Sequence, residues 1–222
     1  MPIVALGVLA AIAAGWWFSS SSEQGAGHEP SDEGDHTLDR MNGTDDGLSR
    51  YGGAASEKLS PHFTLSEFLT TGGRKIDLWP SDPQVENLRT VAGGLEKVRA
   101  AIAAANPGKA LPLRITSGLR NAELNEALAA RYHPAARSRH LWGEAADVAP
   151  PPGWNSIALA DTIANTIPDF DQLIAYAPKD GGHIHVTYCP KRSARKERLY
   201  WVNGAVLRGE DGRAALLRSY TS

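Results

Sequence analysis

A histidine and an aspartate seven residues apart are the side chains with the clearest chemical potential. His140 and Asp147 belong to the segment Ser-Arg-His-Leu-Trp-Gly-Glu-Ala-Ala-Asp, which begins at Ser138. A neutral imidazole and a carboxylate are good zinc ligands, and a second imidazole, from His183 or His185, could complete a set of three. Three protein ligands leave one coordination position for water, which is the layout of a catalytic zinc site.

Small residues surround these two candidate ligands. Gly143, Ala145 and Ala146 fit a tight turn that leads into a strand, because bulky side chains would keep chain and metal apart. We therefore expect a short buried strand over residues 145–149 that carries Asp147 and is stopped by the prolines that follow.

The two downstream imidazoles have the spacing of one strand face. His183 and His185 are two residues apart in a segment, 183–188, that we expect to be a strand. Side chains at this spacing point to the same side, so both imidazoles could reach the same bound water.

The remaining elements predict an α+β domain with a small antiparallel sheet and flanking helices. Thr64 and Glu67 form a capping box at the start of a short helix, and Asn203-Gly204 indicates a hairpin within residues 198–207. One further expected helix opens at Ser81 or Asp82 and ends by Asn106-Pro107-Gly108, and two others cover 122–132 and 156–167. The other expected strands cover 111–116 and 171–176. Leu124 and Leu128 are expected to point inward from their helix.

Bulk composition limits the function classes. The 222 residues allow one domain with appendages, and 42% hydrophobic with 22% charged residues predicts a packed core. A net charge of −2 argues against nucleic acid as the main partner. The single cysteine, Cys189, excludes an internal disulfide, and we expect it to be a buried thiol.

An apolar run opens the chain. Residues 3–18 carry no charge, and as a helix they would reach about 24 Å, slightly less than a hydrocarbon core of about 30 Å. No Lys or Arg precedes the run, and none follows it before Arg40. We expect residues 1–18 to be a transmembrane signal-anchor segment with the rest of the chain on the extracytoplasmic (periplasmic) side. A cleaved signal peptide or a buried helix are the alternatives.

The next segment has the composition of a linker. Residues 19–58 are rich in Ser, Gly, Asp and Glu and nearly lack large aliphatic side chains. Such a segment buries too little apolar surface to offset its ordering entropy, so we expect disorder. The folded domain is expected over residues 59–222.

A family resemblance follows from these segments. The central segment reads S-x-H-x-x-G-x-A-x-D, and its companions in chain order are His62–Phe68, Ile115–Arg120, Phe170–Ile174 and His185–Tyr188. Over roughly residues 59–190 the chain resembles the M15-type zinc D-alanyl-D-alanine peptidases, which share a fold with hedgehog domains and with murein endopeptidases. The resemblance implies this hedgehog/DD-peptidase-like fold and cleavage of peptidoglycan stem peptides.

The resemblance also implies roles for individual residues. His140, Asp147 and His185 would bind Zn²⁺, which lowers the pKa of bound water and polarises an amide carbonyl. Arg120 would hold a substrate carboxylate, and Ser138 would hydrogen-bond the substrate or support the ligands. The implied activity is that of a zinc-dependent D-Ala-D-Ala carboxypeptidase.

The chain departs from the carboxypeptidase branch where a proton carrier is required. That branch has an acid three residues before the last ligand, where this chain has Gly182, whereas His183 matches the H-x-H of the endopeptidase branch. We predict that His183 is the catalytic base, with Glu144 and Asp180 as alternatives. Relatives also carry an acid where Tyr176 stands.

Three other functions stay open at this point. The first is a phage-type lytic murein endopeptidase, or endolysin, and the second is an inactive zinc-bearing module that binds the cell wall. The third is a tethered structural protein of a membrane complex. In the enzyme hypotheses we expect a monomer whose partners are peptidoglycan stem peptides and, through the N-terminal helix, the membrane.

Overall fold

The computed structural model describes residues 57–132, 135–192 and 194–221. The predicted membrane segment (1–18) and all but the last two residues of the predicted linker (19–58) lie outside these residues. In the described part of the chain, no helix combines the length and apolar character needed to cross a membrane.

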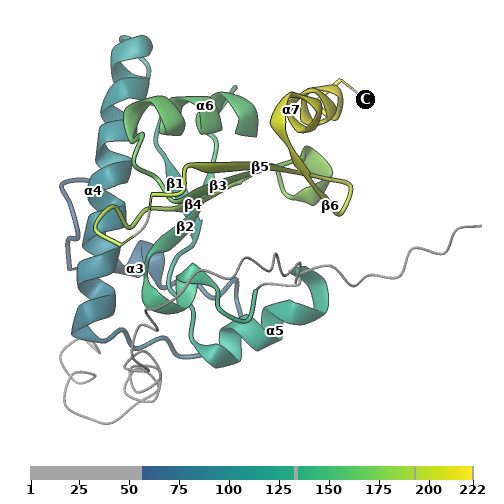
Figure 1. Cartoon of the computed structure of the whole chain (residues 1–222). Helices are drawn as coiled ribbons and strands as arrows, with labels where there is room; N and C mark the ends of the chain where they lie inside the picture. Colours follow the sequence, from purple (N-terminus) through teal and green to yellow (C-terminus); the bar gives the residue numbers. More distant parts are fainter. Residues whose placement is uncertain (1–56, 133–134, 193, 222) are drawn as a thin grey trace, which may run out of the picture. The chain divides into compact units, whose positions relative to one another are not determined.

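A six-stranded mixed sheet with helices around it forms the domain (Figure 1), so the α+β class is confirmed. The strand order is β1-β2-β4-β3-β5-β6. The strands are β1 (Arg114–Ser117), β2 (Ala145–Ala149), β3 (Gln172–Tyr176), β4 (Ile184–Thr187), β5 (Glu197–Val202) and β6 (Ala205–Arg208). β2 has the predicted bounds, whereas β1 begins three residues later than expected.

The prediction of an antiparallel sheet is wrong for one strand pair. β3 and β5 run parallel, with Gln172 beside Glu197 and Tyr176 beside Trp201, while the other four pairs are antiparallel. β4 already occupies one edge of β3, so the chain returns through residues 188–196 and adds β5 to the other edge. The other edge of β4 is taken by β2, so a hairpin onto β4 is not available. β5 runs opposite to β4, and since β3 is antiparallel to β4, β5 lies parallel to β3.

The hairpin that follows is confirmed. Asn203 (φ 52°) and Gly204 (φ 77°) join β5 to β6 with both residues in the left-handed region, as a type I′ turn requires. Helix α7 (Gly209–Arg218) comes next and was not predicted, because its start reads Gly-Glu-Asp-Gly. Gly212 permits this helix to pack closely, since a Cβ there would lie 2.9 Å from the side chains of Tyr200 and Leu207.

Two helices begin the described domain at their predicted starts, and each has a capping box, of which only the one at Thr64 was predicted. In α3 (Leu65–Phe68) the Thr64 backbone N–H donates to Glu67 Oε2 at 2.7 Å, which completes the capping box. In α4 (Asp82–Ala105) the Ser81 N–H donates to Gln84 Oε1 at 2.8 Å.

Two further helices follow in the chain. Helix α5 (Ala122–Tyr132) matches its predicted bounds, with Leu124 buried and Leu128 half-buried. Helix α6 (Ser156–Thr166) ends one residue early.

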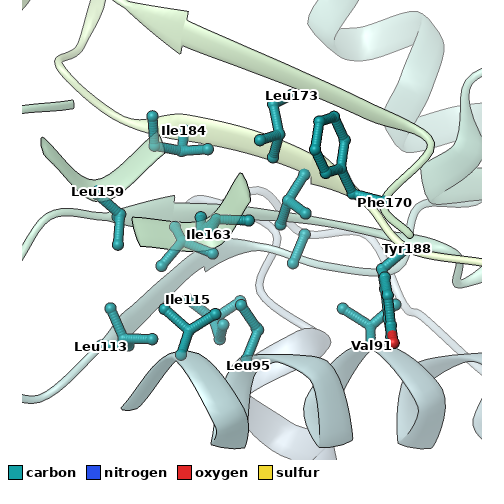
Figure 2. Packing of buried hydrophobic residues seen from close by; sticks show 14 of the residues in the cluster. Val91, Leu95, Leu113, Ile115, Leu159, Ile163, Phe170, Leu173, Ile184 and Tyr188 are labelled. Atoms are coloured by element: carbon teal, nitrogen blue, oxygen red, sulfur yellow. The ribbon is translucent and has the colours of Figure 1, made fainter. Parts of the chain in front are cut away.

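The hydrophobic core lies between these helices and one face of the sheet. Figure 2 shows apolar side chains from α4, α6 and the strands meeting in one cluster. Val148, Leu173 and Ile184 are buried there. Side chains alternate along a strand, so their neighbours Asp147, Ile174 and His185 point to the opposite face. The sheet therefore presents the candidate ligands on the face that the core does not use.

Candidate metal centre

Strand pairing brings two of the predicted ligands together. Asp147 on β2 and His185 on β4 are direct partners in the antiparallel register, so their side chains stand next to each other on one face. Asp147 is buried and His185 is half-buried. Residues that are 38 positions apart in the chain thus become neighbours through the sheet alone.

A short 3₁₀ helix supplies the third ligand. His140 lies in η1 (Arg139–Trp142), which ends at Gly143 with φ 70°. A Cβ at Gly143 would lie 2.7 Å from the Gln84 carbonyl oxygen, so only glycine fits. The Gln84 side chain in turn donates to the Leu141 carbonyl at 2.8 Å and ties η1 to α4. This packing holds His140 at the beginning of β2.

The ligand atoms of the three residues converge. His185 Nδ1 lies 3.0 Å from Asp147 Oδ1 and 3.1 Å from His140 Nε2, and His140 Nε2 lies 3.3 Å from Asp147 Oδ1. Three ligands on a tetrahedral zinc ion with bonds of about 2.0–2.1 Å stand about 3.3 Å apart. The three atoms, which we call the triad, are therefore close to the separation that one shared ion imposes, and the group could hold a metal ion.

The hydrogen bond of His140 fixes its tautomer. Its Nδ1 lies 2.5 Å from the Gly118 carbonyl oxygen, which can only accept, so Nδ1 carries the proton. Burial, helped by the charge of Arg120, lowers the pKa of His140 to about 4, so the ring is neutral at pH 7. Its Nε2 lone pair then points at the other two residues, as a metal ligand requires.

His185 has a partner of the same kind. Its Nε2 lies 3.0 Å from Thr187 Oγ1, two residues further along the same face of β4. With a proton on Nε2, the lone pair on Nδ1 faces Asp147 Oδ1 and His140 Nε2, which are both acceptors. Three acceptors at this separation repel one another unless a proton or a cation lies between them. A divalent cation would satisfy all three at once.

Arg120 fixes the orientation of Asp147. Arg120 Nη2 donates to Asp147 Oδ2 at 2.7 Å, and Arg120 Nε donates to Ser117 Oγ at 3.2 Å. The sequence predicted that Arg120 binds a substrate carboxylate, and that role stays a prediction, because its guanidinium here holds a ligand residue.

The predicted base lies beside the triad. The ring of His183 stacks on that of Tyr176, with centroids 4.2 Å apart and planes at 12°. Burial lowers the pKa of His183, while the charge of Asp147 opposes that shift. No hydrogen bond joins His183 to the triad among the described residues, so its role as base stays a prediction.

Glu144 is engaged elsewhere. It is buried, with Oε2 held by Arg139 at 2.8 Å and Oε1 held by Arg192 at 2.6 Å. These ion pairs fasten η1 to the segment after β4. The other alternative base, Asp180, accepts the backbone N–H of Asn203 at 2.9 Å on the exposed surface.

Ser138 and Cys189, which the sequence analysis also considered, are both buried. Ser138 is buried and precedes η1, where its carbonyl accepts the Leu141 N–H at 2.9 Å. Cys189 is buried as predicted, and burial raises the pKa of its thiol.

The residues that orient the ligands were not predicted. Thr187 could have been found, because it lies two residues after His185 in an expected strand. Gly118 could not, because its carbonyl reaches His140 only after Leu119 N–H bonds the Phe68 carbonyl at 2.7 Å. This contact joins segments that are about 50 residues apart in the chain and has no local signal.

Comparisons with models of known protein families and with curated proteins find no match to this chain. The case for a function therefore rests on the triad and on the motif residues.

Proposed function

We propose that this chain is a zinc metallopeptidase that cleaves the peptide stems of peptidoglycan. The observation that carries the proposal is the convergence of His140 Nε2, His185 Nδ1 and Asp147 Oδ1 within 3.3 Å of one another. The resemblance of the surrounding motifs to zinc D-alanyl-D-alanine peptidases supports the choice of substrate.

The donor set suits zinc. Two neutral imidazoles and one carboxylate are the ligands of many catalytic zinc sites, and no thiolate takes part. A zinc ion held here would supply an activated water and polarise the amide carbonyl of the substrate.

The chain's own residues prepare the site for this chemistry. The Gly118 carbonyl and Thr187 hold the two imidazoles with their lone pairs toward Asp147. Arg120 occupies Oδ2 and leaves Oδ1 to face the imidazoles. His183 is a half-buried imidazole whose lowered pKa keeps it neutral, so it is able to accept a proton from water at neutral pH.

The sequence leaves two candidates for the bond that is cleaved, that of a carboxypeptidase and that of an endopeptidase, and the position of Arg120 helps to choose between them. A carboxypeptidase must bind the free terminal carboxylate of a stem peptide, and Arg120 was the residue expected to do so. Arg120 instead pairs with Asp147 and Ser117. This pairing favours the second candidate, a lytic endopeptidase that cleaves within the stem and needs no terminal carboxylate.

The location follows from the substrate. Peptidoglycan lies outside the cytoplasmic membrane, so we propose that residues 1–18 anchor the chain and that the domain acts on the extracytoplasmic side.

Product analysis on defined muropeptides tests the proposal. The full chain, purified with detergent and loaded with zinc, is incubated with stem peptides that have or lack a free terminal carboxylate, and the products are identified by mass. We expect cleavage that a chelator abolishes and zinc restores. His140→Ala should be inactive, and the matched variant His62→Ala should be active, because His62 lies on the surface against Glu96.

Several outcomes would decide between the hypotheses. Zinc bound by a wild-type chain that releases no product from any wall preparation would indicate a binding module. Full activity of His140→Ala would exclude the metallopeptidase. Equal cleavage with and without the terminal carboxylate would select the endopeptidase.

A further inference from the structure

Tyr176 stands beside the triad at the end of a strand. It is the last residue of β3, and its backbone N–H donates to the His183 carbonyl at 3.0 Å. Ile174 is the register partner of His185, and Tyr176 lies two residues further along β3. Because strand side chains alternate, Tyr176 shares the face of Ile174 and His185, while Ala175 points into the core.

Two neighbours fix the direction of its ring. The His183 ring stacks on it at 4.2 Å, and the Trp201 ring lies at 5.8 Å with the planes at 28°. Trp201 is the parallel register partner of Tyr176 on β5, and His183 directly precedes β4, so the Tyr176 ring on β3 has an aromatic ring on each side. A ring held by adjacent aromatic rings loses little further entropy when its hydroxyl binds a ligand.

The hydroxyl of Tyr176 has no protein partner among the described residues. By contrast, the hydroxyl of Tyr188 donates to Asp169 at 3.3 Å, and that of Tyr220 meets Ser156 Oγ at 2.7 Å. Asp147, the carboxylate of the triad, has Oδ2 bound by Arg120, and its Oδ1 lies 3.0 Å from His185 Nδ1. The Tyr176 hydroxyl is thus a donor on the triad's face of the sheet that is available to a bound molecule.

Its electrostatic surroundings keep this donor protonated. Burial and the negative charge of Asp147 raise the pKa of the Tyr176 hydroxyl. At neutral pH the group is therefore an uncharged phenol that can donate a hydrogen bond.

We propose that the Tyr176 hydroxyl donates a hydrogen bond to the carbonyl oxygen of the amide that is cleaved, which makes Tyr176 a catalytic residue. Negative charge grows on this oxygen when water adds to the carbonyl carbon, so a donor already fixed in place stabilises the transition state more than the ground state. Trp201 and His183 act on this step as positioning residues for the ring. The inference rests on the proposed peptidase function.

The test removes only the hydroxyl. Tyr176→Phe keeps the stacked ring, and Tyr200→Phe is the matched control, because Tyr200 lies on the opposite face of β5 against α7. The zinc-loaded full chain is assayed for zinc content, for kcat and KM on a stem peptide, and for affinity toward a phosphinate dipeptide. The tetrahedral anionic phosphinate resembles the product of water addition to an amide.

We expect Tyr176→Phe to bind zinc as the wild type does, to lose about ten- to a hundredfold in kcat with little change in KM, and to bind the phosphinate weaker by a similar factor. Tyr200→Phe should match the wild type in all three measurements. Trp201→Leu, which loosens the ring, should show a smaller loss in kcat.

The phosphinate affinity tests the role of the Tyr176 hydroxyl separately from the proposed peptidase function. Equal phosphinate affinity of Tyr176→Phe and the wild type would overturn the inference, and so would a wild type that binds no phosphinate. A wild type that cleaves no stem peptide, but whose phosphinate affinity depends on the Tyr176 hydroxyl, would overturn the proposed substrate and leave Tyr176 as a hydrogen-bond donor to a tetrahedral anion.

Discussion

Two buried carboxylates three residues apart have opposite surroundings. Glu144 lies between the guanidinium groups of Arg139 and Arg192, so each of its oxygens meets a cation. Asp147 has one oxygen on Arg120 and the other facing the acceptor nitrogens of two imidazoles. Both oxygens of Glu144 thus meet a cation, whereas only Oδ2 of Asp147 does, and its Oδ1 faces the two imidazoles. We infer that Glu144 stabilises the fold through its two ion pairs and that Asp147 binds a ligand.

The largest expected effect is the loss of zinc affinity when the charge of Asp147 is removed. Asp147→Asn keeps the shape of the side chain but removes the charge, so zinc affinity should fall at least about a hundredfold, and activity with it. Zinc content after dialysis and the rate of stem-peptide cleavage measure the loss. Retained zinc together with full activity would mean that Asp147 is not a ligand.

The corresponding substitution of Glu144 should lower the free energy of unfolding and leave zinc binding unchanged. Glu144→Gln leaves two arginines without their carboxylate, and we expect a loss of about 1–3 kcal/mol in the free energy of unfolding, less than for a fully buried pair because both arginines are partly exposed. Zinc affinity should not change. A folded Glu144→Gln protein with unaltered stability and no activity would instead identify Glu144 as the catalytic base.

Substitution of Thr187, which orients His185, should have an intermediate effect, and only on zinc affinity. Thr187→Val removes the partner of His185 Nε2 and preserves the branched shape of the side chain. Zinc affinity should fall about ten- to a hundredfold, as is typical when a group that orients a ligand is lost. Competition with a chelator of known affinity measures it, and an unchanged affinity would assign Thr187 to packing.

The smallest effect is expected at a third carboxylate that resembles Glu144 but lies near the surface. Asp161 binds Arg198 and Arg213, and although partial burial alone would raise its pKa, these arginines lower it. Its contribution to stability is present above its unfolded pKa of about 3.9 and disappears as the pH falls through the lower folded value. The difference in unfolding free energy between wild type and Asp161→Asn should therefore shrink below about pH 4, without any change in zinc binding. A difference that grows in acid would contradict the direction of the shift.

The sequence predicted local features of the fold well. The capping box at Thr64, the Asn203-Gly204 turn and the strand at 145–149 depend on a few adjacent residues, and the structure has each of them. The parallel addition of β5 and helix α7 were missed, because each depends on contacts between distant segments.

In the candidate site, too, the ligand residues were predicted and the contacts between distant segments were not. The grouping of His140, Asp147 and His185 was predicted from the motif and the companion strand, and the structure brings them together. The pairing of Arg120 with Asp147 was not foreseen, since it joins side chains 27 positions apart in the chain. Side chains that orient ligands through such contacts become visible only in the folded chain.

The zinc coordination of the wild-type chain is the most direct test of the central claim. X-ray absorption at the zinc edge of the loaded full chain should show one zinc per chain bound by two imidazole nitrogens and a carboxylate oxygen, with no sulfur. The same measurement on His140→Ala should show that this coordination is lost. A wild-type chain that binds no zinc, or a zinc ion bound by sulfur or unaffected by His140→Ala, would contradict the account.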